Sequence, residues 1–78
     1  MKNNIKMFMN DMDIKTSEKF RVIFRTSRND YWDKEYEYWF DDKYVLNYTD
    51  NRGNEHGTLF TSELYDLLIG RFHNIIKL

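Results

Sequence analysis

A chain of 78 residues holds one domain with a small core, and its 18% aromatic content supplies large side chains for that core. The absence of cysteine excludes a disulfide scaffold and is typical of a reducing compartment. A net charge of −1 excludes the general excess of Lys and Arg that marks a nucleic-acid binder. The chain lacks both a membrane-span-length apolar run and a signal-peptide pattern, so we expect a soluble, cytoplasmic protein.

The first predicted element is a short helix near the N-terminus. Its apolar residues follow the spacing i, i+3, i+4, i+7 and are Ile5, Phe8, Met9 and Met12. Asn3 or Asn4 can serve as the N-cap. The run IKMFM can instead form a strand, so the sequence does not decide between a helix and a strand for this segment.

A strand is predicted over residues 20–26, followed by a polar turn over 27–30. Phe20, Val22 and Phe24 alternate with Arg21 and Arg25, as expected for a strand with one buried face.

Two further strands are predicted over 35–40 and 43–49, joined by a turn at Asp41-Asp42. Alternation places one set of side chains on the core face, namely Tyr36, Tyr38, Phe40, Tyr44, Leu46 and Tyr48. It places Trp39 on the opposite face with Glu35 and Glu37. A loop over 49–57 and a short strand over 57–60 complete a four-stranded meander.

The last predicted element is a helix over 61–78, with Thr61 or Ser62 as its cap. Gly70 weakens this helix by roughly 1 kcal/mol. Apolar residues at helical spacing form its core face: Leu64, Leu67, Leu68, Phe72, Ile75 and Ile76. The sequence therefore predicts an α+β domain in which a small antiparallel sheet packs against a C-terminal helix.

Acidic and aromatic residues concentrate in residues 29–44, NDYWDKEYEYWFDDKY. This stretch holds both tryptophans, four of the six tyrosines and six acidic residues, but only two lysines. The charge is also segregated along the chain. Residues 1–28 carry seven Lys and Arg against three Asp and Glu, whereas residues 29–56 carry three against eight.

Exposed aromatic side chains among polar groups are typical of protein-binding surfaces, and clustered carboxylates attract a basic partner. We therefore predict a face that binds a basic, nucleic-acid-binding surface of a partner protein. Its residues are Asp30, Tyr31, Trp32, Asp33, Glu35, Glu37, Trp39, Asp41 and Asp42. The alternative is that the aromatic residues are core and the acids form a solvated edge that blocks strand pairing.

Other classes of function have weaker support in the sequence. A sheet with exposed aromatic residues can bind single-stranded nucleic acid, with Arg21, Arg25 and Arg28 on the phosphates. His56 and His73 have no recognisable catalytic partner, so we expect no enzymatic activity. We expect no cofactor, and residues 50–55 lack the spacing of a calcium loop. The apolar, methionine-rich N-terminus or the C-terminal helix can also form a homodimer contact.

With its length, its lack of Cys and Pro, its sheet-plus-helix organisation and the stretch NDYWDKEYEYWFDD, the chain resembles the small phage-encoded inhibitors known as anti-CRISPR proteins. The resemblance covers composition and architecture and involves no shared motif. It implies a compact α/β fold that occupies a nucleic-acid recognition site on a CRISPR effector in the host cytoplasm.

Overall fold

The computed structural model describes residues 2–25, 30–58 and 62–78. Their order is α1 (Lys2–Met12), β1 (Phe20–Arg25), β2 (Tyr31–Asp33), β3 (Glu37–Phe40), β4 (Leu46–Thr49), β5 (Glu55–Thr58), α2 (Ser62–Leu68) and β6 (Phe72–Lys77). The α+β class is confirmed. The N-terminal segment is a helix rather than a strand, and six strands of the described residues form one antiparallel sheet where four were predicted.

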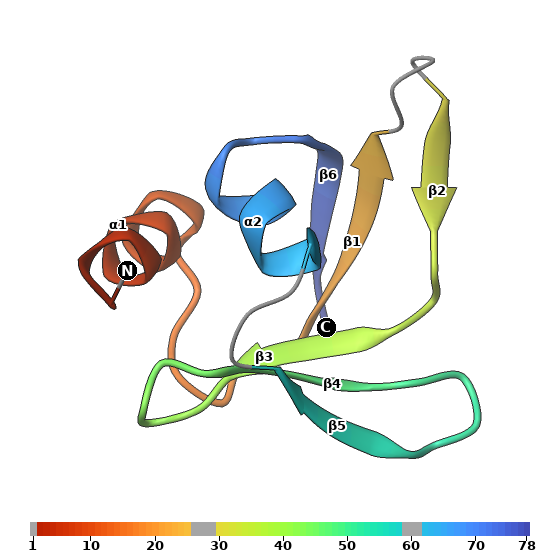
Figure 1. Ribbon diagram of the computed structural model, residues 1–78, viewed down its shortest axis with the longest axis horizontal. Helices are drawn as coiled ribbons and strands as arrows, with labels where there is room; N and C mark the ends of the chain where they lie inside the picture. Colours follow the sequence, from red (N-terminus) through yellow and green to blue (C-terminus); the bar gives the residue numbers. More distant parts are fainter. Residues whose placement is uncertain (1, 26–29, 59–61) are drawn as a thin grey trace.

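Strand β1 lies at the centre of the sheet. It pairs with β6 along one edge, and its other edge pairs first with β3, at Phe20, and then with β2. Strands β3, β4 and β5 follow as a meander. In Figure 1, β1, β2 and β6 run in one direction of the view while β3, β4 and β5 run in another, so the sheet is strongly bent.

The bend lies between β2 and β3, which together act as one interrupted partner of β1. The pairing moves from Ile23↔Asp33 to Phe20↔Tyr38, so three steps along β1 (23 to 20) stand opposite five steps along its partner (33 to 38). The extra residues fall in segment 34–36, where Glu35 has a φ of 60°. Extra residues on one strand bend it, as in a β-bulge.

The core lies between the sheet and the two helices, which are on the same side of β1 and β6 (Figure 1). The predicted alternation of β1 is confirmed, because Phe20, Val22 and Phe24 are buried. The buried apolar side chains are Ile5, Phe8, Met9, Ile14, Phe20, Val22, Phe24, Tyr38, Phe40, Leu46, Leu64 and Leu67. Of the predicted tyrosine face, Tyr38 is enclosed, whereas Tyr36, Tyr44 and Tyr48 are half-buried at its margin.

The predicted helix over 61–78 is wrong beyond Leu68. Gly70 has a φ of 79°, its N–H donates to the Leu67 carbonyl (3.2 Å), and the Arg71 N–H donates to the Asp66 carbonyl (2.8 Å). This is a Schellman cap, in which glycine takes the left-handed conformation that ends a helix. The chain then turns back as β6, where Ile75 stands opposite Val22 of β1.

Other boundaries shift by a few residues. Residues 31–33, which lie outside the predicted strands, form strand β2, and the strands predicted over 35–40 and 43–49 are shorter in the structure. The strand predicted over 57–60 begins earlier, at Glu55. Expectations for residues 26–29 and 59–61, including the Thr61 cap and the Arg28 phosphate contact, lie outside the described residues.

Candidate protein-binding surface

Two of the predicted anchor residues, Tyr31 and Trp32, are exposed on β2. Tyr31 is 57% exposed and Trp32 is 54% exposed. They point to opposite faces, because neighbouring residues of a strand alternate. The Tyr31 ring stacks on His73 of β6, with 4.1 Å between the ring centroids. Trp32 stands opposite Phe24, on the face that carries the helices. Asp30, just before β2, is exposed as well.

Two of the predicted acidic residues form ion pairs with basic residues of the first third of the chain. A carboxylate oxygen of Asp33 accepts a hydrogen bond from Arg21, and the Glu37 carboxylate lies 3.9 Å from the Lys19 ammonium. The other Asp33 oxygen accepts the N–H of Glu35 at 2.8 Å. The Asp33 carboxylate therefore links β1 to the bend, whereas the half-exposed Lys19–Glu37 pair adds little stability. The exposed Glu35 side chain is left on the bend.

The remaining predicted residues lie away from β2. Trp39 is half-buried on the face opposite the helices, with the Lys19 ammonium 5.1 Å from its ring. Asp41 accepts the N–H groups of Lys43 and Val45, and so holds the β3–β4 turn. Asp42 is exposed in the same turn, which Figure 1 shows at the end of the sheet opposite to β2. The nine predicted residues therefore do not form one continuous face.

An unpredicted row of aromatic side chains crosses the sheet near β2. The Tyr36 and Tyr48 rings are stacked at 5.1 Å, and the Tyr48 and His56 rings at 4.8 Å. The Lys34 ammonium joins this row to β2, because it lies 5.8 Å from the Tyr36 ring and 4.6 Å from the Trp32 ring. We call Trp32, Tyr36, Tyr48 and His56 the aromatic stripe. Figure 1 shows β2 and the β4–β5 turn on the side of the sheet away from α1.

The rings of the aromatic stripe cover one another's faces. Tyr48 lies between Tyr36 on the β3 side and His56 on the β5 side, with interplanar angles of 5° and 23°. One face of Trp32 is covered by the Lys34 ammonium. Stacked nucleobases need a free ring face. Both faces of the Tyr48 ring are therefore occupied, and the exposed rings of the stripe are Trp32 and His56. Tyrosine and tryptophan are the residues that protein-binding surfaces use most.

Sequence patterns alone missed the aromatic stripe. Alternation correctly placed Tyr36 and Tyr48 on one face, but they were interpreted as core because a long C-terminal helix was expected above them. In the structure α2 ends at Leu68, and Tyr36 and Tyr48 are half-buried rather than enclosed. His56 was interpreted as a loop residue. Its place opposite Tyr48 depends on the register of β4 and β5, which no local signal fixes.

Lys34 links three elements at the base of Trp32. Its side chain is 15% exposed, and its ammonium forms an ion pair with Glu63 of α2. The same ammonium faces the rings of Trp32, Tyr36 and Phe24, the last at 5.9 Å. The aromatic rings and the Glu63 carboxylate replace the interactions with water that the Lys34 ammonium loses on burial. Lys34 therefore fixes the orientation of Trp32 relative to the core.

We expect Lys34→Met to lower the free energy of unfolding by about 1–2 kcal/mol, because the stem still packs while Glu63 loses its charged partner. Urea denaturation measures this value. The matched control is Lys43→Met at the exposed position in the β3–β4 turn, which should stay within about 0.5 kcal/mol of the native chain. Equal effects of the two substitutions would contradict a linking role for Lys34.

The β4–β5 turn is organised by the carboxylate of Asp50. One oxygen accepts the N–H groups of Arg52 and Asn54, each at 2.9 Å, and the other lies 3.0 Å from His56 Nε2. The hydrogen bond to His56, followed by the one from the Asn54 N–H, lowers the pKa of Asp50 from 3.8 to about 2. Asp50 thereby holds the His56 end of the aromatic stripe.

This shift predicts a pH dependence. Because the pKa of Asp50 is lower in the folded chain, its contribution is present above about pH 4 and is lost as the pH falls from 3.8 towards 2. We expect the native chain to lose more stability between pH 5 and pH 2 than Asp50→Asn does, as measured by urea denaturation at each pH. Asp11→Asn, at an exposed carboxyl on α1, is the control. Parallel curves for the native chain and Asp50→Asn would contradict this role.

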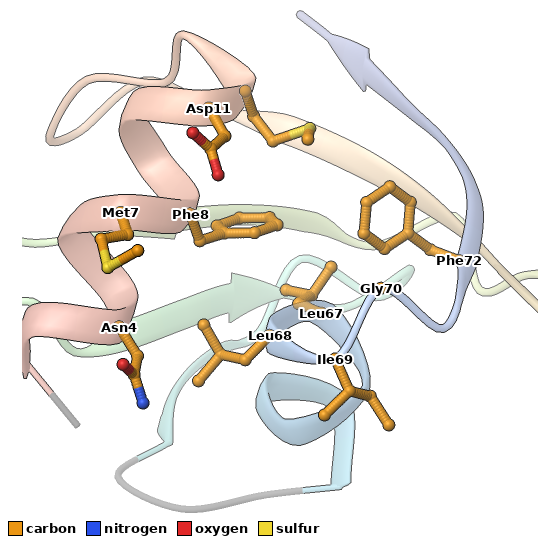
Figure 2. A pocket seen from close by; sticks show the side chains of 10 residues that line it. Asn4, Met7, Phe8, Asp11, Leu67, Leu68, Ile69, Gly70 and Phe72 are labelled. Atoms are coloured by element: carbon orange, nitrogen blue, oxygen red, sulfur yellow. The ribbon is translucent and has the colours of Figure 1, made fainter.

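An apolar groove of about 360 Å³ lies between the helices. Figure 2 shows Met7 and Phe8 of α1 on one side and Leu68 of α2 with Ile69, which follows it, on the other; Phe72 lies at the end of the groove. Met7 is 64% exposed here. The homodimer contact expected from the methionine-rich N-terminus stays a prediction.

Neither helix of the described residues is long and apolar enough to cross a membrane. Within residues 2–25, 30–58 and 62–78, no three His, Asp or Glu side chains are grouped so that they could hold a metal ion. Comparisons of the chain with protein-family models, curated proteins and solved structures found no match.

Proposed function

We propose that the protein is a non-enzymatic binding protein that inhibits a host protein by docking the aromatic stripe, with the exposed Trp32 of β2 as its anchor, on it. The observation that carries this proposal is the row of four aromatic side chains joined by Lys34, in which Trp32 and His56 are exposed and Tyr36 and Tyr48 are half-buried. Contiguous aromatic surface rimmed by polar groups is characteristic of protein interfaces.

The partner we propose carries a basic surface, of the kind that binds nucleic acid in a CRISPR effector. The support is the Glu35 side chain, which lies between Trp32 and Tyr36 in the chain and is exposed. No basic side chain of the described residues pairs with it. Glu35 also holds a left-handed backbone conformation, which costs a non-glycine residue about 1–2 kcal/mol. Strained backbone of this kind is concentrated at functional sites.

The binding partner is sought by capture from a bacterial lysate on the immobilised chain, with identification by mass spectrometry. We expect a protein with a basic nucleic-acid-binding surface that elutes as the salt concentration rises, because exposed charge pairs are screened. The proposal would be contradicted if the native chain captured every protein only to the level that the Trp32→Ala variant retains.

Glu35→Gly separates binding from stability. Glycine tolerates the left-handed conformation, so we expect the free energy of unfolding to rise by about 1 kcal/mol. Loss of the carboxylate should at the same time raise the dissociation constant for the captured partner about tenfold, which corresponds to about 1.4 kcal/mol. Urea denaturation and titration calorimetry measure the two effects. Unchanged affinity would remove Glu35 from the interface.

Single-stranded nucleic acid is the competing ligand. In Trp39→Phe, Trp32 is the remaining tryptophan, so its fluorescence reports directly on the stripe. We expect oligo(dT) and oligo(U) to leave this fluorescence unchanged at about 100 μM, the weak end of non-specific binding. Strong quenching would show that bases stack on Trp32 and would favour the nucleic-acid function.

A further inference from the structure

The apolar groove between α1 and α2 has an exposed apolar residue on each rim. Met7, at the middle of α1, is 64% exposed, and Ile69, on the opposite rim, is 48% exposed. Asn4, Met7 and Asp11 line the α1 side of the groove at the helical spacing i, i+3, i+7 (Figure 2). All three side chains are exposed. This face of α1 therefore has an apolar residue at its centre and a polar residue about one turn away on either side.

The charges of α1 oppose the macrodipole of the helix. Lys2 lies in the first turn, which has no acidic residue, and Asp11 lies in the last turn, which has no basic residue. The opposite arrangement is the favourable one, because the N-terminal end of a helix is positive and its C-terminal end is negative. Within the described part of the chain, no ion pair compensates Lys2 or Asp11. Both ends of α1 thus carry a charge that a suitable neighbour would stabilise.

A second copy of α1, laid antiparallel along this face, supplies that neighbour. With a two-fold axis beside Met7, the two Met7 side chains meet at the centre of the contact. Asp11 lies about 6 Å beyond Met7 along the helix axis, and Asn4 lies about 4.5 Å before it, at a rise of about 1.5 Å per residue. Asp11 of one copy is therefore level with Asn4 and the first turn of the other, where free N–H groups and the positive helix end attract a carboxylate.

We propose that the groove between the helices is covered by a second copy of the chain, in a homodimer formed by antiparallel α1 helices. Each Met7 packs over the groove of the other copy, and each Asp11 accepts a hydrogen bond from the side-chain amide of Asn4 in the other copy. Two short helices bury less than the roughly 1,200 Å² of a standard interface, so we expect a weak dimer with a Kd on the order of 100 μM. The aromatic stripe lies on the side of the sheet away from α1, so the dimer leaves both stripes free (Figure 1).

Sedimentation velocity of the full chain between about 1 μM and about 1 mM tests the dimer, and we expect monomer at the lower end and mostly dimer at the upper end. Met7→Ala should raise the dimer dissociation constant about tenfold, because it removes the apolar centre of the contact. Tyr65→Ala, which removes an exposed ring of α2 outside the groove, should change it less than about twofold. A monomer at every concentration, or equal effects of the two substitutions, would overturn the proposal. Urea denaturation at about 1 μM observes the monomer, so the stability effects of substitutions at Met7 and Asp11 are measured there.

A pair of charge variants tests the antiparallel geometry. Asp11→Lys places a cation at the positive end of the other helix, and Asn4→Asp places a second carboxylate opposite Asp11. We expect each variant alone to dimerise about tenfold more weakly than the native chain. Both substitutions suit the macrodipole of their own helix, so the monomer keeps its fold. In an equimolar mixture the new lysine of one variant faces the new aspartate of the other, so a heterodimer should form more tightly than either homodimer. A mixture that dimerises no better than its two components would overturn the proposal.

Discussion

Trp32→Ala should weaken binding of the captured partner by about 30-fold or more, which corresponds to about 2 kcal/mol. The reason is that Trp32 combines a large exposed surface with a fixed orientation. It is 54% exposed, yet its ring lies against the Lys34 ammonium, and its strand is paired with β1. A tryptophan that is already ordered loses little conformational freedom on binding, so more of its contact energy appears as affinity.

The matched control is Tyr65→Ala. Tyr65 is 58% exposed, so its replacement by alanine removes a comparable exposed aromatic surface. It lies on α2, outside the aromatic stripe. We expect its affinity to stay within about twofold of the native chain. Surface plasmon resonance with the captured partner measures both variants. A larger loss in Tyr65→Ala than in Trp32→Ala would place the interface on the helices.

Phe40→Ala should lower the free energy of unfolding by about 3–5 kcal/mol, because a fully buried phenyl ring is replaced by a cavity. Phe40 is 0% exposed, and its ring packs against Phe8 of α1 at 6.1 Å and against Phe20 of β1 at 6.0 Å. It therefore connects the N-terminal helix to both halves of the bent sheet. The loss approaches the lower end of the total stability of a small domain.

Urea denaturation of Phe40→Ala measures this loss, with Met7→Ala as the control. Met7 is also apolar but lies exposed on α1, so its replacement should change the free energy of unfolding by about 0.5 kcal/mol or less. A loss below about 1 kcal/mol for Phe40→Ala would contradict the assignment of Phe40 to the core.

The β1 strand and the C-terminal segment show why local patterns predicted one element correctly and another wrongly. In β1 the alternation of Phe20, Val22 and Phe24 has one explanation, and the strand formed as expected. In residues 62–77 the apolar spacing fits a long helix, but it also fits a short helix followed by a strand. The decision lies in Gly70, which favours a helix end, and in the pairing of β6 with β1, which is a tertiary contact.

The segregated charge along the chain has a structural explanation that the sequence did not reveal. Lys19 and Arg21, from the basic first third, pair with Glu37 and Asp33 of the acidic middle third. These pairs arise because β1 lies beside both β2 and β3. Blocks of opposite charge thus become cross-strand pairs, which reduces the acidic surface that the composition alone suggests.

The candidate surface was predictable in part. The concentration of aromatic residues in the sequence correctly drew attention to Tyr31 and Trp32, which are exposed. The contribution of Tyr48 and His56 was not predictable, because it depends on the register between strands and on where α2 ends. The bend at Glu35 also lacks a glycine or proline that would have marked it.

The most direct test of the aromatic stripe as a binding surface is amide hydrogen exchange of the chain with and without the captured partner. We predict that the partner slows exchange in β2, in the bend over residues 34–36 and in the β4–β5 turn, while α1 exchanges at its original rate. Slower exchange confined to α1 and α2 would contradict the account, because it would place the partner on the apolar groove between the helices.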